Sequence, residues 1–410
     1  MIPETAGVRT ATIIGFAASL CTVGAADGQE LIAFAGSHVD PGYVAQHLER
    51  IESRPFDGMV INEYLGRNLL NMRLKDDAPR MLDASSGAVT YAAAAGDLAP
   101  LKGVFKKFRH NFAKVNFNMV GVPPLLNADA DWRVVEESAA NYARAVRDTG
   151  LRGIFFDNES YLPVAMSGSW SGANYWIYED QLALAGQSRS LMPLVTAVAL
   201  ARQRGRELMQ AFVRGYPSIT VIVAHGPHEG CDAWRSASGH FGMDHYLLGA
   251  FAAGMLEGSS GDATLVDGGE DYDLRNTRDF ALARAWRKGI RTPGAGSITD
   301  LGPMKCPFMD AGLAADWPGK SNIAFSTFDK ERASLTTNNW TAISNVAQFQ
   351  STLTNALRAS DRYVWHYTQW QDWWGDTMED VLKPWSAAIE AARRDAHTVS
   401  GSSNASLAGR

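Results

Sequence analysis

Two short acidic motifs carry side chains that could do chemistry. Asp157-Asn158-Glu159 follows an apolar run, and Asp267-Gly268-Gly269-Glu270-Asp271 follows another. Hydrolysis of a glycosidic bond uses two carboxyl groups. One protonates the leaving oxygen, and the other acts as the nucleophile or activates a water molecule. We therefore take Glu159 and Glu270, together with Asp157, as the candidate catalytic residues of a two-carboxylate site.

The spacing within the first motif brings its two carboxylates together. Side chains alternate along a strand, so Asp157 and Glu159 project to the same side if the strand geometry persists. Carboxylates crowded into a semi-buried site raise at least one pKa, as a general acid requires. Alternatively, Asp157 and Asp267 are hydrogen-bonded braces and only the two glutamates react. The two glycines before Glu270 fit a sharp turn, a close approach of the ligand, or an ordinary loop.

Other polar and aromatic side chains follow the predicted strands and are candidates for binding substrate. The chain contains 12 Trp, 12 Tyr and 17 Phe, and aromatic rings present large apolar faces to a ligand. Trp370, Trp373 and Trp374 could stack on sugar rings or pack against the last helix. His225 and His366 could each be structural. The candidate binding residues are Asn62, Tyr161, His225, Asp267, Asp271, Tyr272, His366, Gln369, Trp370, Trp373 and Trp374.

The sequence offers few signs of other chemistries. It has no HExxH or His-x-His motif, and neither Cys231 nor Cys306 has a CxxC partner, so we expect no metal and no cofactor. A GxSxG motif, which would indicate a serine esterase, is missing too. The two cysteines could form one disulfide in an exported protein.

Short apolar runs alternate with amphipathic stretches, and this alternation predicts a single-domain α/β fold, a (β/α)8 TIM barrel with long strand-to-helix loops. Its active face would lie at the carboxyl ends of the strands. A doubly wound open sheet is the alternative, but it lacks a Gly-rich phosphate loop after its first strand. The seventh strand is either Pro307–Met309 or Ile323–Phe325. The other predicted strands are Leu31–Ala35, Met59–Ile61, Lys114–Val120, Gly153–Phe156, Thr220–Ala224, Ala263–Val266 and Tyr363–Tyr367. Predicted helices cover 41–52, 131–147, 194–216, 246–256, 277–288 and 383–396.

The two ends of the chain differ from the rest. Residues 1–26 have a basic residue, a short apolar run and small residues, which is typical of a signal peptide, so we expect a secreted or periplasmic protein without a membrane anchor. The barrel would occupy 27–397, followed by a disordered tail at 398–410. The net charge of −6 disfavours nucleic acid as a partner and leaves the oligomeric state open.

Five phrases in order resemble a group of poorly characterised secreted bacterial barrel proteins labelled glycoside-hydrolase-like. The resemblance runs from about residue 30 to 395 and implies a barrel, export and a carbohydrate substrate, with Asp157, Glu159, Asp267 and Glu270 at the matching acidic positions. Such proteins often read Tyr-Ser-Glu where this chain has Tyr367-Thr368-Gln369, so Gln369 would bind rather than react. The phrases are Ser53–Val60, Gly153–Tyr161, Arg202–Met209, Val266–Tyr272 and Tyr363–Trp374.

Asn158-Glu159 is also similar to the Asn-Glu pair that ends strand four in retaining glycosidases of the large barrel superfamily, where the glutamate is the acid/base. Their nucleophile ends strand seven, and here Asp310 and Asp316 are the nearest carboxylates to that position. We expect Glu159 to be the acid/base and Glu270 its partner.

Three functions remain open from the sequence. The leading one is a glycoside hydrolase acting on an extracellular polysaccharide or oligosaccharide. The others are a glycan-binding barrel without turnover and a polysaccharide lyase. A carboxyl separation of about 5 Å would indicate a retaining mechanism, and about 6.5–9.5 Å an inverting one.

Overall fold

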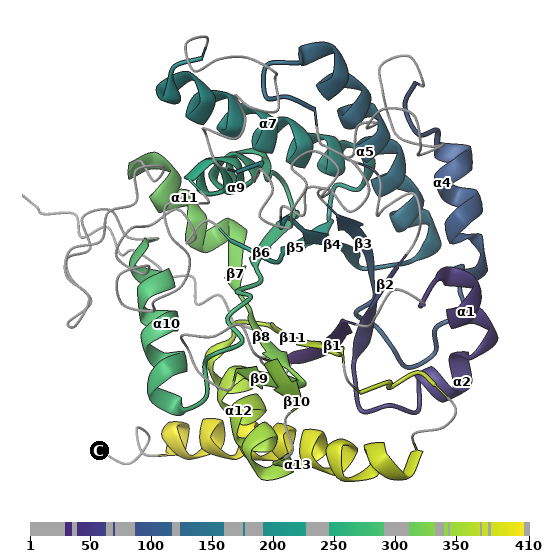
Figure 1. Cartoon of the computed structure of the whole chain (residues 1–410), viewed down its shortest axis with the longest axis vertical. Helices are drawn as coiled ribbons and strands as arrows, with labels where there is room; N and C mark the ends of the chain where they lie inside the picture. Colours follow the sequence, from purple (N-terminus) through teal and green to yellow (C-terminus); the bar gives the residue numbers. More distant parts are fainter. Residues whose placement is uncertain are drawn as a thin grey trace, which may run out of the picture.

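The computed structural model shows a barrel of parallel strands surrounded by helices (Figure 1). The predicted signal peptide, Cys231 and Cys306 lie outside the residues that the structure describes. These residues are 29–34, 39–62, 69, 87–116, 124–159, 175–176, 192–226, 246–290, 311–332, 340–342, 345–369, 371–375 and 379–405.

The strands pair in parallel, in the order β7-β6-β5-β4-β3-β2-β1-β11-β8. The predicted strands one to six and eight are each found, although the third begins and ends earlier than expected. Their bounds are β1 Glu30–Phe34, β2 Gly58–Ile61, β3 Phe112–Asn116, β4 Gly153–Asp157, β5 Thr220–Val223, β6 Thr264–Asp267 and β11 Tyr363–Tyr367.

The seventh strand closes the barrel in two pieces. β7 (Ser321–Ile323) pairs with β6, and β8 (Phe325–Phe328) pairs with β11. Only Ala324 separates them, and its backbone N–H donates to the Asp267 carbonyl at 2.8 Å. One extended stretch therefore joins both ends of the sheet order, which confirms the α/β barrel. Of the two segments proposed for this strand, the one around Ile323–Phe325 is right.

Helices surround the ring of strands in Figure 1, and a small antiparallel hairpin of β9 (Lys330–Arg332) and β10 (Trp340–Ala342) follows β8. None of the described helices is long and apolar enough to cross a membrane. The helical elements are α1 Pro41–Gln46, α2 Leu48–Ile51, α4 Tyr91–Leu98, η1 Ala99–Leu101, α5 Asp129–Thr149, α7 Leu194–Gly215, α9 Tyr246–Gly258, α10 Thr277–Ile290, α11 Ala311–Lys320, α12 Val346–Ala359 and α13 Glu379–Ala405.

The last helix continues further than the sequence suggested. α13 ends at Ala405, so a helix covers 398–405 of the segment that we expected to be disordered. The small residues of that segment are compatible with a helix that extends one already nucleated and packed upstream.

Alternation along the strands divides the core into two layers. Inside the barrel, Ile32, Phe155, Ile222 and Trp365 belong to one buried cluster. Their strand neighbours Leu31, Ile154, Val221 and Val364 belong to a larger cluster between strands and helices. The barrel interior is therefore a packed core, and side chains just beyond the strand ends are those free to form a site.

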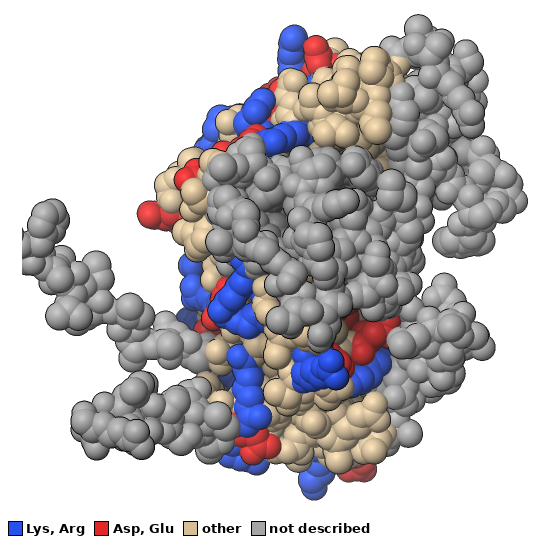
Figure 2. Space-filling model, turned by 90° about the vertical axis from the view of Figure 1, so that its left-hand side faces the viewer, with Lys and Arg blue, Asp and Glu red and all other residues tan. Residues whose placement is uncertain are grey.

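Charged side chains of both signs lie interspersed on the face shown in Figure 2.

Glycines allow α7 and α9 to pack with their backbones close together. A Cβ on Gly254 would lie 1.8 Å from the Arg202 carbonyl oxygen, and one on Gly205 would lie 1.9 Å from that of Phe251. Because the obstructing atoms are backbone, the helices would have to move apart to admit a methyl group.

We predict that Gly254→Ala destabilises the protein by about 1–3 kcal/mol, the usual cost of overpacking. Gly96→Ala is the matched control, because Gly96 is exposed within α4 and a Cβ there meets nothing within 4 Å. The control should be stabilising by about 0.5–1 kcal/mol. Urea denaturation compares the free energies of unfolding. Equal effects of the two substitutions would contradict the close packing of α7 and α9.

Candidate active site

The ends of β4 and β5 are joined by the side chain of Asn158. Its Nδ2 donates to the His225 carbonyl at 2.8 Å, and its Oδ1 accepts from the His225 backbone N–H at 2.9 Å. The indole of Trp176 donates to the Asn158 carbonyl at 2.8 Å. Asn158 is fully buried, so this pairing holds the neighbouring Glu159 and His225 in a fixed relation.

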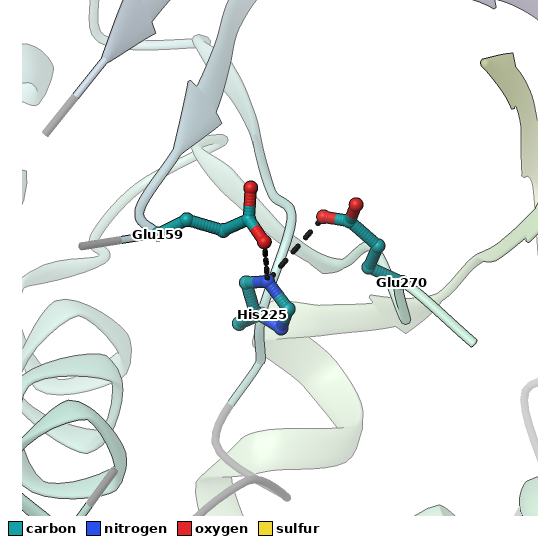
Figure 3. Close-up of side chains that lie close together, drawn as sticks. All are labelled: Glu159, His225 and Glu270. Atoms are coloured by element: carbon teal, nitrogen blue, oxygen red, sulfur yellow. Dashed lines mark ion pairs between the residues drawn. The ribbon is translucent and has the colours of Figure 1, made fainter. Parts of the chain in front are cut away.

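Three titratable side chains converge at the carboxyl end of the barrel, as Figure 3 shows. His225 Nε2 lies 3.4 Å from Glu159 Oε1 and 3.3 Å from Glu270 Oε2. One oxygen from each glutamate and the imidazole nitrogen all lie within 4.8 Å of one another. Glu159 and Glu270, from strands four and six, therefore face each other with His225 between them.

Burial and mutual repulsion disfavour two negative charges in this cluster. Burial raises the pKa of Glu270 well above its usual value, and the charge of Glu159 raises it further. Burial also raises the pKa of Glu159, although the hydrogen bond to His225 opposes that rise. Because two carboxyl groups this close resist ionising together, the arrangement favours one protonated and one ionised group, and the larger rise in pKa is at Glu270.

Asp157 lies on the same side of β4 as Glu159, and other side chains brace it. Its Oδ2 accepts from Lys114 Nζ at 3.0 Å and from Asn116 Nδ2 at 3.1 Å. These contacts favour the alternative in which Asp157 is a brace. Its charge contributes to raising the pKa of Glu159, after burial.

Lys114 and Asn116 were missed because the third strand was predicted to begin at Lys114. With β3 at Phe112–Asn116, both side chains fall on the inner face, alternating with the outward-facing Ala113 and Val115. Lys114 Nζ also lies 4.4 Å from the centroid of the Phe34 ring. The available signal was that Lys114 and Asn116 alternate with the apolar residues Ala113 and Val115.

Aromatic rings line the barrel beside the glutamates. The rings of Tyr367 and Phe328 stack with centroids 5.1 Å apart, and those of Tyr272 and Phe328 are 4.6 Å apart. Phe34 is 5.1 Å from Tyr367. Burial and then the charge of Glu270 raise the pKa of Tyr272 well above its usual value, and the same two causes raise that of Tyr367 to about 12. Both phenols therefore stay neutral donors. Of these four rings, the sequence reasoning had singled out only Tyr272.

Of the other predicted polar residues near strands two and six, Asn62 and Asp267 are buried and Asp271 is half-buried. Asp267 is 1% exposed, and its Oδ1 lies where a Cβ on Gly226 would fall, 2.1 Å away. Asp271 forms an ion pair with Arg287. Asn62 is buried beyond β2, with its backbone N–H bonded to the Val39 carbonyl at 3.0 Å. The positions of Asp267 and Asp271 fit braces better than substrate contacts.

Three residues predicted to bind substrate need correction, because the structure places them in the outer layer of the core. His366 faces outward on β11, where Thr327 Oγ1 is 3.0 Å from its Nδ1, and burial lowers its pKa to about 3. Trp373 and Trp374 are buried in the outer core around Phe56. They pack outside the barrel because the chain turns outward after β11.

Gln369 is exposed just beyond β11, and its Oε1 accepts from Lys330 Nζ at 2.8 Å, so its role in binding substrate stays a prediction. Tyr161 and Trp370 lie outside the described residues.

A carboxylate does follow the seventh strand, but it does not join the cluster. Asp329 is fully buried, and its Oδ2 accepts from the backbone N–H groups of Gln369 at 3.0 Å and Gln371 at 2.7 Å. The inward position on β8 is taken by Phe328. Asp316 is exposed on α11 and pairs with Lys320, and Asp310 lies outside the described residues. Glu159 therefore meets a glutamate from strand six.

The same three side chains could also coordinate a divalent cation. Carboxylate and imidazole donors about 2 Å from a metal ion, with one position left open, are typical of catalytic zinc sites. The convergence of Glu159, His225 and Glu270 fits such a donor set. The sequence-based expectation of a metal-free site thus stays a prediction.

No protein-family model matches the chain, and no curated protein matches it. Among solved structures, an endocellulase from Pyrococcus horikoshii in complex with cellotetraose is 10% identical, with 89% of this chain and 92% of that chain covered and a TM-score of 0.39. The catalytic domain of a β-amylase from Paenibacillus polymyxa is 10% identical, with 90% and 98% covered and a TM-score of 0.37. An endo-fucoidan hydrolase of glycoside hydrolase family 107 is 11% identical, with 90% and 92% covered and a TM-score of 0.31. The chain is similar to these three glycoside hydrolases in the course of its backbone.

Proposed function

We propose that this protein is a secreted or periplasmic glycoside hydrolase that cleaves a polysaccharide or oligosaccharide with Glu159 and Glu270. The observation that carries the proposal is that one oxygen of Glu159 and one oxygen of Glu270 lie within 4.8 Å of each other. Retaining glycosidases hold their two carboxyl groups about 5–5.5 Å apart, whereas inverting ones leave room for a water molecule between them. The separation supports a retaining mechanism.

The surroundings of the two glutamates support different roles. Glu270 has the more strongly raised pKa, which suits a general acid that protonates the leaving oxygen. The hydrogen bond to His225 and the charge of Lys114 counter the rise at Glu159, which suits a carboxylate that attacks the anomeric carbon. Glu270 would then deprotonate the water that releases the sugar. This assignment reverses the one that the sequence suggested.

The aromatic rings beside the glutamates supply a surface for the sugar. Tyr272 and Tyr367 are partly exposed, and their rings stack on each other with centroids 6.1 Å apart. Aromatic faces match the C–H faces of a sugar, while the neutral phenol groups can donate hydrogen bonds to its hydroxyls. In the proposal these tyrosines take the place of Trp373 and Trp374. A lyase would need a cation to neutralise a uronate, and Lys114 is already paired with Asp157.

We predict that Glu159→Gln and Glu270→Gln each lower hydrolysis by about 10²–10⁴-fold, the usual contribution of acid–base groups. Release of reducing ends from a panel of polysaccharides identifies the substrate and measures the rate. Asp316→Asn on the exposed face of α11 is the matched control and should keep full activity. In a variant truncated at the nucleophile, which we expect to be Glu159→Ala, azide should restore turnover and give a glycosyl azide of inverted configuration, whereas in Glu270→Ala it should give the retained configuration. Full activity of either glutamine variant would rule out the two-carboxylate mechanism. Binding without turnover by the native protein would identify a glycan-binding barrel.

The raised pKa of Glu270 predicts a pH-dependent cost to stability. The unfolded chain ionises this group near pH 4.5, whereas the folded protein keeps the proton to higher pH, so the protein loses stability as pH rises through this range. Glu270→Gln removes the effect, and its stability relative to the native protein should increase with pH. The increase is about 1.4 kcal/mol for each unit by which the pKa is raised. Urea denaturation between pH 4 and pH 8 measures it, and a difference that does not change with pH would contradict the buried position.

A metal-assisted hydrolase is a second candidate, favoured by the convergence of the three donor groups. Under the two-carboxylate mechanism, dialysis against EDTA should leave activity unchanged, and added Zn²⁺ should restore nothing. Loss of activity with the chelator and recovery with Zn²⁺ would instead establish the metal mechanism, in which Glu159, His225 and Glu270 serve as ligands.

A further inference from the structure

Arg287 lies buried beneath the loop that carries Glu270. It projects from α10, its side chain is 1% exposed, and its guanidinium lies over the Phe325 ring at 4.6 Å. One nitrogen donates to the Ala324 carbonyl at 2.7 Å, and another is paired with the Asp271 carboxylate. Arg287 thus bridges the break between β7 and β8 and the residue that follows Glu270.

The guanidinium also lies against the residue before Glu270. Gly269 has a φ of +57°, and a Cβ at this position would fall 2.1 Å from both terminal nitrogens of Arg287. Only glycine adopts such a conformation readily and leaves this space open. The double glycine noted in the sequence therefore serves a close approach, and the group that approaches is an arginine of the protein.

Three further hydrogen bonds hold the same loop. The Glu270 backbone N–H donates to the Ala224 carbonyl at 3.2 Å, next to His225. The Gly269 carbonyl accepts from Ser326 Oγ at 2.9 Å, and the Gly268 carbonyl accepts from Trp365 Nε1 at 2.8 Å. These bonds fix the backbone before Glu270, whereas Arg287 fixes it after Glu270 through Asp271.

We propose that Arg287 is a positioning residue that holds the Glu270 carboxyl group against His225 and Glu159. The effect of Arg287 on catalysis rests on the proposed function, whereas the placement of Glu270 by Arg287 rests on the contacts described above. Arg287 does not reach the sugar. It acts through Asp271 and Gly269, the two neighbours of Glu270.

Arg287→Lys is the variant that separates positioning from charge. Lysine keeps the positive charge near Asp271, which avoids leaving a buried carboxylate alone. A single ammonium cannot reproduce the planar fork that reaches Asp271 and Ala324 together. Arg284→Lys is the matched control, because Arg284 lies three residues earlier on α10 and likewise binds one carboxylate, Asp361, and one carbonyl, that of Ala359.

Two measurements on the full chain test the proposal. The first is the kinetics on the polysaccharide that the substrate panel identifies. A displacement of a reacting group by about 1 Å costs on the order of 100-fold in rate. We expect Arg287→Lys to lower kcat by that order while KM stays nearly constant, and Arg284→Lys to change neither. The second is a double-mutant cycle of Arg287→Lys with Glu270→Gln, read as the change in unfolding free energy between pH 5 and pH 8.

The cycle reports the position of Glu270 without any substrate. In the native background and with Arg284→Lys, Glu270→Gln should give a stability difference that grows with pH. With Arg287→Lys, Glu270 should move toward solvent, and most of that growth should disappear. If the growth persists in the Arg287→Lys background, Arg287 does not hold Glu270 and the inference is wrong, even where Glu159 and Glu270 prove essential for hydrolysis. If Glu270→Gln leaves hydrolysis intact, the proposed function fails while the cycle still decides the role of Arg287.

Discussion

The strongest physical constraint on this structure is the electrostatic cost of placing two glutamates beside one histidine at the end of the barrel. The surrounding residues must offset that cost. Glu159 and Glu270 lose much of their hydration there, and each raises the cost of ionising the other. Such an arrangement persists only if the surrounding scaffold prevents the side chains from turning into water. Raised pKa values of this kind gather at functional sites, where the environment is arranged to shift them.

Polar contacts between the surrounding residues hold the cluster in place. Asn158 fixes the backbone of His225 through two hydrogen bonds. Lys114 forms an ion pair with Asp157, and Asn116 donates a hydrogen bond to it, so the charge of this third carboxylate is balanced locally. Arg287 and Asp271 form their ion pair just beneath Glu270. Each brace lies in the layer next to the three side chains of the cluster, as is usual where the geometry of a site must be held closely.

Closure of the barrel through a strand in two pieces connects the fold to the site. β7 completes the pairing of β6, and β8 turns to β11, so the break at Ala324 leaves a carbonyl that Arg287 can bind. The inward position at the end of β8 then holds Phe328, which packs against Tyr272 and Tyr367. An aromatic surface thus stands at the end of strand seven, and the second glutamate of the cluster comes from strand six.

Local pattern in the sequence was enough to predict the barrel, seven of its strands and the acidic motifs after strands four and six. These depend on hydrophobic period and on short-range alternation, which a single stretch of chain carries by itself. The tertiary structure alone decided which face the later residues occupy. His366 near the end of a strand and Trp373 beyond it looked like site residues, yet packing against Phe56 places them outside the barrel. Arg287 gave no local sign of its role, because its partners at Gly269 and Ala324 meet it only when the ring closes. A side chain's surroundings come from residues far away in the chain, and no periodicity along the sequence encodes them.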